Sequence, residues 1–226
     1  MPQKPELHVS LSVESIPMAD ARRITAILLA AGLSKRLGRN KLLLPFGDET
    51  VLRKTAKAVL ASAVSEVILV TGHEHEKVKQ AVSGLNVRLK HNPRYAEGQS
   101  TSMIAGIEAA SENAEAYLFV LGDQPLLTPE IVNGLIARYG ESRPDALVAA
   151  PVFKGRRGNP ALFAASLRDE LLRASGDAGG RGIIKRLETE SPGGIVFLEL
   201  PNDDIFLDID TEEDYELMLR KFPETS

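Results

Sequence analysis

The chain has 226 residues, of which 43% are hydrophobic and 26% are charged, enough apolar material for one large domain or two small ones. Its formal net charge of −4 argues against a general nucleic-acid-binding surface, which is normally basic. The absence of cysteine excludes disulfides, thiolate catalysis and cysteine zinc sites. Apolar runs are too short to cross a bilayer and the N-terminus lacks a signal-peptide pattern, so we expect a cytoplasmic protein that binds neither membranes nor nucleic acid.

Short β-branched runs alternate with helical patterns from residue 24 onward. In chain order we expect a strand over 24–30, a helix over 51–62, a strand over 66–71, a helix near 74–82, a strand over 86–91, a helix over 100–110, a strand over 116–121 and a helix over 129–139. A less regular half follows, with a strand over 146–153, a helix over 166–174, a strand over 195–200 and a helix over 211–221, and with loops at 154–160 and 176–181. This alternation predicts an α/β fold in which helices cover both faces of a Rossmann-like, mostly parallel sheet.

A loop rich in glycine and cationic side chains follows the first predicted strand. Residues 32–41 read G-x-S-x-R-x-G-x-x-K, which matches neither the Walker pattern nor the dinucleotide-binding pattern G-x-G-x-x-G. Glycine permits backbone conformations with positive φ, and the N–H groups of such turns bind anions. Arg36 and Lys41 add positive charge where phosphates would sit. The loop therefore predicts a nucleoside triphosphate site, although a plain turn with solvated cations has the same composition.

Carboxylates stand out at two further places. Asp123 follows the most hydrophobic predicted strand, where it would serve either in a turn or as a Mg²⁺ ligand. Asp208 and Asp210 alternate with apolar residues, so on a strand they would share one face. Thr211 suits the N-cap of the last predicted helix, with residues 212–214 as its acidic first turn.

These motifs and three others resemble, in the same order, those of the molybdenum cofactor cytidylyltransferase and guanylyltransferase group of nucleotidyltransferases. The others are residues 92–102 (N-P-R-Y-A-E-G-Q-S-T-S), 157–160 (R-G-N-P) and 176–181 (G-D-A-G-G-R). The resemblance extends from residue 24 to about 222. The chain departs from the usual pattern at Leu37 (Met), Tyr95 (Trp), Asn159 (His) and Glu212 (Pro). Asparagine does not titrate near neutral pH, which argues against an acid–base role at position 159.

The resemblance implies the nucleotide-diphospho-sugar transferase-like fold of GT-A type. Residues 1–23 would be an N-terminal extension and 24–226 one domain, with 24–125 binding mainly the nucleotide and 126–226 mainly the acceptor. The catalytic residues would be Arg36, Lys41 and Asp123, and Asp123 and Asp210 would hold Mg²⁺. The implied nucleotide-binding residues are Ala30, Ala31, Gly32, Ser34, Arg36, Gly38, Lys41, Ser100 and Ser102. The implied acceptor-binding residues are Asn159, Asp177 and Arg181, although Arg181 could instead lie on a helix surface. Ser100 or Ser102 could instead cap the following helix.

The implied reaction transfers CMP from CTP to the phosphate of molybdopterin or the molybdenum cofactor and releases pyrophosphate. CTP is favoured because Ala31 stands where the guanylyltransferases generally carry a second glycine. Alternatives stay open: guanylyl transfer to the same cofactor, and transfer to a sugar phosphate or another phosphorylated alcohol. A further alternative is a protein that binds and delivers the cofactor without turnover. A molybdoenzyme client is a further expected partner.

Overall fold

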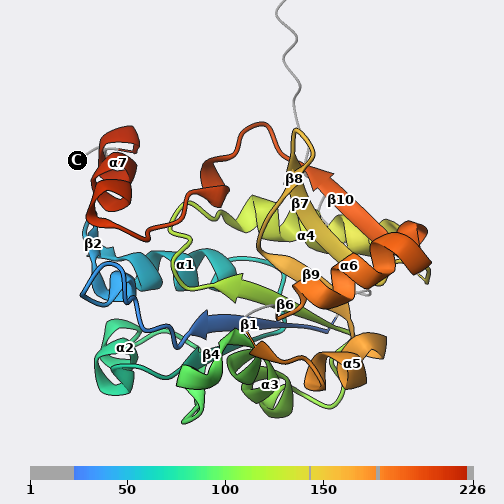
Figure 1. Ribbon diagram of the computed structural model, residues 1–226, viewed down its shortest axis with the longest axis horizontal. Helices are drawn as coiled ribbons and strands as arrows, with labels where there is room; N and C mark the ends of the chain where they lie inside the picture. Colours follow the sequence, from blue (N-terminus) through green and yellow to red (C-terminus); the bar gives the residue numbers. More distant parts are fainter. Residues whose placement is uncertain (1–22, 143, 177–178, 223–226) are drawn as a thin grey trace, which may run out of the picture.

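The computed structural model describes residues 23–142, 144–176 and 179–222 (Figure 1). Its centre is an eight-stranded sheet with the order β10-β7-β9-β6-β1-β4-β5, in which β8 pairs with β7. The strands are β1 (Ile24–Ala30), β4 (Glu66–Thr71), β5 (Arg88–His91), β6 (Ala116–Leu121), β7 (Val148–Phe153), β8 (Arg156–Arg157), β9 (Ala161–Ala164) and β10 (Ile195–Glu199). A separate hairpin joins β2 (Pro45–Phe46) and β3 (Glu49–Thr50). Residues 1–22, most of the expected extension, lie outside the described residues.

Most neighbouring strands run parallel, as the β-α alternation predicts. The run β6-β1-β4-β5 is parallel throughout, and so is the pair of β10 and β7. β9 is antiparallel to both of its neighbours, β6 and β7, and β8 is antiparallel to β7. The predicted fold class, a mostly parallel sheet between layers of helices, is confirmed.

Helices cover both faces of this sheet (Figure 1). Apolar side chains of α1 (Val51–Leu60), α2 (His75–Ala81) and α4 (Pro129–Glu141) form one core layer, and those of α3 (Gln99–Ala109), α5 (Arg168–Leu172) and α6 (Arg181–Glu190) form the other. The last helix, α7 (Glu212–Lys221), packs on the β2–β3 hairpin through Phe46, Tyr215 and Met218.

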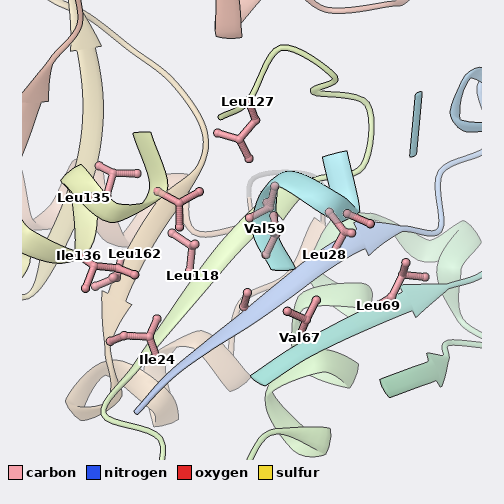
Figure 2. Packing of buried hydrophobic residues seen from close by; sticks show 14 of the residues in the cluster. Ile24, Leu28, Val59, Val67, Leu69, Leu118, Leu127, Leu135, Ile136 and Leu162 are labelled. Carbon is pink, nitrogen blue, oxygen red and sulfur yellow. The ribbon is translucent and has the colours of Figure 1, made fainter. Parts of the chain in front are cut away.

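The period of two along β1 explains how one strand serves both layers. Ile24 and Leu28 belong to the layer that includes α1, whereas Ile27 packs with the helices of the opposite face. Figure 2 shows Val59 of α1 close to Leu28. Because β1 is buried on both faces, its sequence is an almost unbroken apolar run.

Several elements differ from the sequence expectations. β9 lies where none is predicted, because four apolar residues are too few to show a period, and pairing on both sides buries it. Residues 154–160 form more than a loop, since they contain β8. Helix α6 follows the expected loop and is not predicted, although the spacing of Ile183, Ile184 and Leu187 is typical of a helix. The helix expected over 166–174 is shorter, a 3₁₀ turn (Ala165–Leu167) followed by α5.

No helix in the described part of the chain is both long and apolar enough to span a membrane.

The start of α7 follows the prediction for its N-cap. The Thr211 Oγ1 accepts a hydrogen bond from Asp214 N at 3.2 Å, and Asp214 Oδ2 accepts one from Thr211 N at 2.8 Å. These bonds form a capping box, and the hydrogen bonds from Thr211 lower the pKa of Asp214.

We expect Thr211→Ala to lower the free energy of unfolding by about 1 kcal/mol, because helix α7 loses its cap. A carboxyl with a lowered folded-state pKa stabilises the fold above its unfolded pKa, so the difference from wild type shrinks as the pH falls below about 4. Urea unfolding at pH 7 and in acid measures both effects. Thr189→Ala, at an exposed position of α6, is the matched control; an equal loss of stability in the two variants contradicts the prediction.

Candidate active site

The carboxyl ends of β1, β4 and β6 lie at one edge of the sheet. β1 is the middle strand, with β4 and β6 parallel to it on either side. At such a switch in strand order the chain leaves in opposite directions, which opens a crevice beyond the strand ends. A cavity of about 450 Å³ lies here. Its walls come from residues 31–35, from Lys41 and Leu42, from Tyr95, Ala96, Gly98, Gln99 and Ser102, and from Leu29, Leu121 and Asp123.

The loop after β1 is held in a tight turn. Ser34 has a positive φ of 47°, and its carbonyl oxygen accepts hydrogen bonds from Leu37 N and Gly38 N, both at 3.2 Å. The Ser34 Oγ accepts a further bond from Lys41 N at 3.2 Å. Gly38 has a φ of 71°, a conformation that favours glycine. The turn therefore fixes the backbone that leads into Lys41.

Lys41 joins two acids that are far apart in the sequence. Its Nζ contacts Asp123 Oδ2 directly and lies 3.2 Å from Asp210 Oδ1. The side chains of Lys41 and Asp123 are only 19% and 11% exposed. Arg36 Nη2 lies 2.6 Å from Asp210 Oδ2, although the Arg36 side chain is 71% exposed. The structure thus brings together the four charged residues to which the sequence assigns catalysis and metal binding.

The charges in this cluster shift two pKa values. Burial acts to lower the pKa of Lys41, but the carboxylates of Asp123 and Asp210 outweigh it and raise that pKa. Burial of its carboxyl and then the charges of Asp123 and Asp210 raise the pKa of Asp208, although much of the residue's surface is exposed. The cluster therefore holds a third acid and a lysine that stays charged at neutral pH.

Asp208 and Asp210 reach the site without a strand. Residues 207–210 form no β-structure, so the expectation that these acids share a strand face is wrong. The segment instead runs from a 3₁₀ turn (Asp204–Phe206) to the N-cap of α7, and buried Ile209 anchors it in the cluster with Tyr215. Its position depends on packing against α7, which the alternating pattern alone does not encode.

The predicted nucleotide-binding residues divide into two groups. Ala31, Gly32, Ser34, Lys41 and Ser102 line the cavity. The others lie outside its lining: Ala30 and Ser100 are buried, Arg36 contacts Asp210, and Gly38 lines a second cavity that shares Ser34 with the first. Successive side chains of an extended chain point to opposite sides, so Ala30, next to Ala31, packs in the core layer that includes α1.

The interpretation of Ser100 or Ser102 as a helix cap is wrong. α3 begins at Gln99, with Gly98 at the N-cap, and no side chain caps it. Ser102 is held by Asn92, whose Nδ2 donates a hydrogen bond to the Ser102 Oγ at 3.0 Å. Asn92 thereby fixes the start of α3 beside the cavity.

Two of the three predicted acceptor-binding residues, Asn159 and Arg181, lie beside the cavity. Asn159 and Arg181 line a small space of about 50 Å³ that shares Leu29, Gln99 and Leu121 with the larger cavity. Arg181 is the first residue of α6. Asp177 lies outside the described residues.

Two residues near the site have no role in the sequence expectations. Gln124, next to Asp123, is buried and hydrogen-bonded to three backbone groups. Tyr95 lines the cavity and packs on Gly72, where even a Cβ atom would collide with it. Gln124 stands in the same G-D-Q-P motif as Asp123, which is a signal for it, but its partners are main-chain atoms that no motif reveals.

The donor atoms at this site suit a hard cation. Asp123 and Asp210 offer carboxylate oxygens that already share one cationic partner, Lys41. Among the described residues no group of three or more acidic, histidine or cysteine side chains is placed to hold a metal. A divalent ion here would draw its remaining ligands from phosphates and water, which is common for Mg²⁺.

Comparison with known proteins gives relatives over most of the chain. The molybdenum cofactor cytidylyltransferase of Escherichia coli (strain K12) is 30% identical over 193 residues, which is 85% of this chain and 93% of that protein. The nicotine blue oxidoreductase of Paenarthrobacter nicotinovorans is 30% identical over 195 residues, 84% of this chain and 93% of that protein. Since the two names state different activities, the particular reaction has to be argued from the site.

Solved structures share the fold. A nucleotidyl transferase from Methanothermobacter thermautotroptrophicus has a TM-score of 0.77 and 28% identity, covering 90% of this chain and 99% of that one. A manganese complex of Rv0371C from Mycobacterium tuberculosis has a TM-score of 0.67 and 25% identity, covering 88% and 98%. Residues 26–191 match the family described as the MobA-like NTP transferase domain. The chain therefore belongs to the MobA-like NTP transferase family and is an enzyme of the nucleotidyltransferase type.

Proposed function

We propose that this protein transfers a cytidylyl group from CTP to the phosphate of a molybdopterin-type acceptor in the presence of Mg²⁺. The observation that carries this proposal is the meeting of Asp123, Asp210 and Lys41 at the edge of a cavity lined by the glycine-containing loop. The E. coli relative named as a molybdenum cofactor cytidylyltransferase supports the choice of acceptor. We place the reaction in the cytoplasm and propose a molybdoenzyme as the client of its product.

Steric crowding around Ala31 supports a pyrimidine nucleotide. Ala31 is buried and lines the cavity. A Cβ atom on Gly72 would lie 2.8 Å from Ala31 Cβ and 2.5 Å from Tyr95 Cβ, so these three residues form one tightly packed wall. The methyl group of Ala31 takes up space in this wall that a glycine would leave free, and on this ground we propose the smaller base.

The side chains would act by alignment and charge. Lys41 and Arg36 would exchange their carboxylate partners for the phosphates of the nucleotide, and backbone N–H groups of the turn that are not already bonded to Ser34 O would donate to the same phosphates. Asp123 and Asp210 would hold Mg²⁺, which supplies charge neutralisation at the reacting phosphates. An oxygen of the acceptor phosphate forms a bond to the α-phosphorus. The bond from that phosphorus to the oxygen bridging to the β-phosphorus breaks, and pyrophosphate leaves with the electron pair. No residue needs to become covalently attached.

The acceptor would enter from the side of Asn159 and Arg181. The small space that these residues line is continuous in its walls with the nucleotide cavity, through Leu29, Gln99 and Leu121. Arg181 would bind an acceptor phosphate, and Asp177 remains a proposed contact of the same acceptor.

A nucleotide panel tests the proposal. The purified protein is incubated with Mg²⁺, with either extracted molybdenum cofactor or a sugar phosphate as the acceptor, and with CTP, GTP, ATP or UTP, and pyrophosphate release and product mass are measured. We expect pyrophosphate and a cytidylylated product with CTP above all. If GTP were the preferred donor, the proposed nucleotide would be GTP and not CTP. If turnover occurred only with a sugar phosphate, the proposed acceptor would be wrong. Cofactor binding without any pyrophosphate release would contradict an enzymatic role.

A further inference from the structure

Gln124 is a buried side chain that uses its amide on three different segments. It is 4% exposed. Its Oε1 accepts a hydrogen bond from Leu121 N, at the end of β6, at 3.4 Å. Its Nε2 donates to Asn159 O at 3.2 Å and to Ile205 O at 3.0 Å. Both amide hydrogens are therefore spent on main-chain carbonyls of segments that are distant in the sequence.

The two segments that Gln124 holds also pack against each other. A Cβ atom on Gly158 would overlap the ring of Phe206, so the backbone of one segment lies directly on a side chain of the other. The guanidinium of Arg156 lies 5.6 Å from the centroid of the same ring. The loop around Gly158 and the turn at Phe206 therefore form one unit, and Gln124 fastens this unit to β6.

Each part of this unit is next to a residue of the site. Asp123 immediately precedes Gln124. Asn159 lines the small space on the acceptor side. Ile205 begins the short segment that leads to Asp208 and Asp210. One amide group thus connects Asp123, the segment that leads to Asp210, and the loop on the acceptor side. A shift of any one of these three would therefore move the other two.

We propose that Gln124 is a positioning residue that sets the separation of Asp123 and Asp210 and couples the acceptor loop (residues 155–160) to them. The inference rests on the proposed function, in which these two acids bind the divalent ion. Glutamine has the length and the two donors needed here. A methionine of similar shape has neither donor, and a glutamate would turn carboxylate oxygens toward two carbonyls.

The affinity for Mn²⁺ in the presence of a non-hydrolysable CTP analogue tests this role without turnover or acceptor. Free Mn²⁺ is measured by electron paramagnetic resonance. We expect Gln124→Met and Gln124→Glu to weaken Mn²⁺ binding at least tenfold. The control is Arg53→Met, because Arg53 also donates to two backbone carbonyls, Ala81 O at 3.1 Å and Ser83 O at 2.9 Å, and none of these three residues lines the cavity. The control should lose stability but keep the wild-type affinity for Mn²⁺.

A purely structural role predicts another result. In that case the Gln124 variants lose stability in urea, as the control does, but bind Mn²⁺ within twofold of wild type, and this outcome overturns the inference. If Gln124→Met does not fold, Gln124→Asn replaces it. Asparagine is one methylene shorter, so we expect it to lose at least one of the two carbonyl contacts, and less than a threefold loss of Mn²⁺ affinity is then the contradicting result. The two proposals can fail separately. If the nucleotide panel gives no product but the Gln124 variants still bind Mn²⁺ at least tenfold more weakly, the proposed acceptor is wrong and the positioning role of Gln124 stands.

Discussion

Replacing Asp123 with asparagine should lower turnover by roughly 10²–10³-fold and leave the fold intact, a loss typical of removing one preorganised electrostatic group. Asp123 is the least exposed acid of the cluster and contacts Lys41 directly. Asparagine keeps its shape but removes the charge that would hold a divalent ion. In this variant Lys41 keeps its ion pair with Asp210 at 3.2 Å, so its buried ammonium group still has a charged partner. The measurements are kcat/KM from pyrophosphate release and the circular dichroism spectrum.

The matched control for this variant is Asp48→Asn, at an exposed position in the β2–β3 hairpin. It should keep wild-type kcat/KM. If Asp123→Asn turned over within threefold of wild type, Asp123 would have no part in the chemistry, and the assignment of metal binding would have to move to Asp208 and Asp210.

Lys41→Met should change two affinities in opposite directions. Nucleotide binding and turnover should fall by about 10²-fold, because a fixed cation is lost from the phosphate site. Mn²⁺ binding without nucleotide should become several-fold tighter, because the ammonium that already neutralises Asp123 and Asp210 no longer competes with the metal. Isothermal titration with CTP and electron paramagnetic resonance with Mn²⁺ measure the two affinities separately.

The pKa of Lys41 fixes the pH range of this result. Because the pKa of Lys41 is raised in the folded protein, the ammonium keeps its contacts with the two carboxylates at every pH below the ordinary lysine pKa. These contacts are lost only when the pH rises through the higher folded-state pKa. From about pH 6 to 9 the opposite shifts should therefore persist unchanged. Lys185→Met, at an exposed position of α6, is the control. Weaker Mn²⁺ binding in Lys41→Met would show that Lys41 helps to form the metal site and does not compete for it.

Much of the fold follows from local patterns in the sequence. β1, β4 and β6 are apolar runs that are buried along nearly their whole length, and such runs separated by helical patterns indicate a parallel sheet. The sequence also places the N-cap of α7 correctly, since Thr211 and Asp214 have capping-box spacing. These features depend on neighbours in the chain, which is why one sequence is enough to predict them.

The features that the sequence does not predict depend on partners distant in the chain. β9 is buried only because β6 and β7 pair with it on both sides. Residues 207–210 reach the site through the packing of Ile209 against the cluster of α7, and Gln124 acts on carbonyl groups of residues 159 and 205. Residue types indicate which side chains carry charge, whereas the contact between Lys41 and the two acids depends on the loop after β1, the end of β6 and the packing of Ile209 against the cluster of α7.

Anomalous diffraction from crystals grown with Mn²⁺ and a non-hydrolysable CTP analogue tests the central claim most directly. We expect an anomalous manganese peak within bonding distance of carboxylate oxygens of both Asp123 and Asp210, with Lys41 and Arg36 turned to the nucleotide phosphates. A peak away from both acids, or a nucleotide bound while Lys41 still bridges Asp123 and Asp210, would contradict the account.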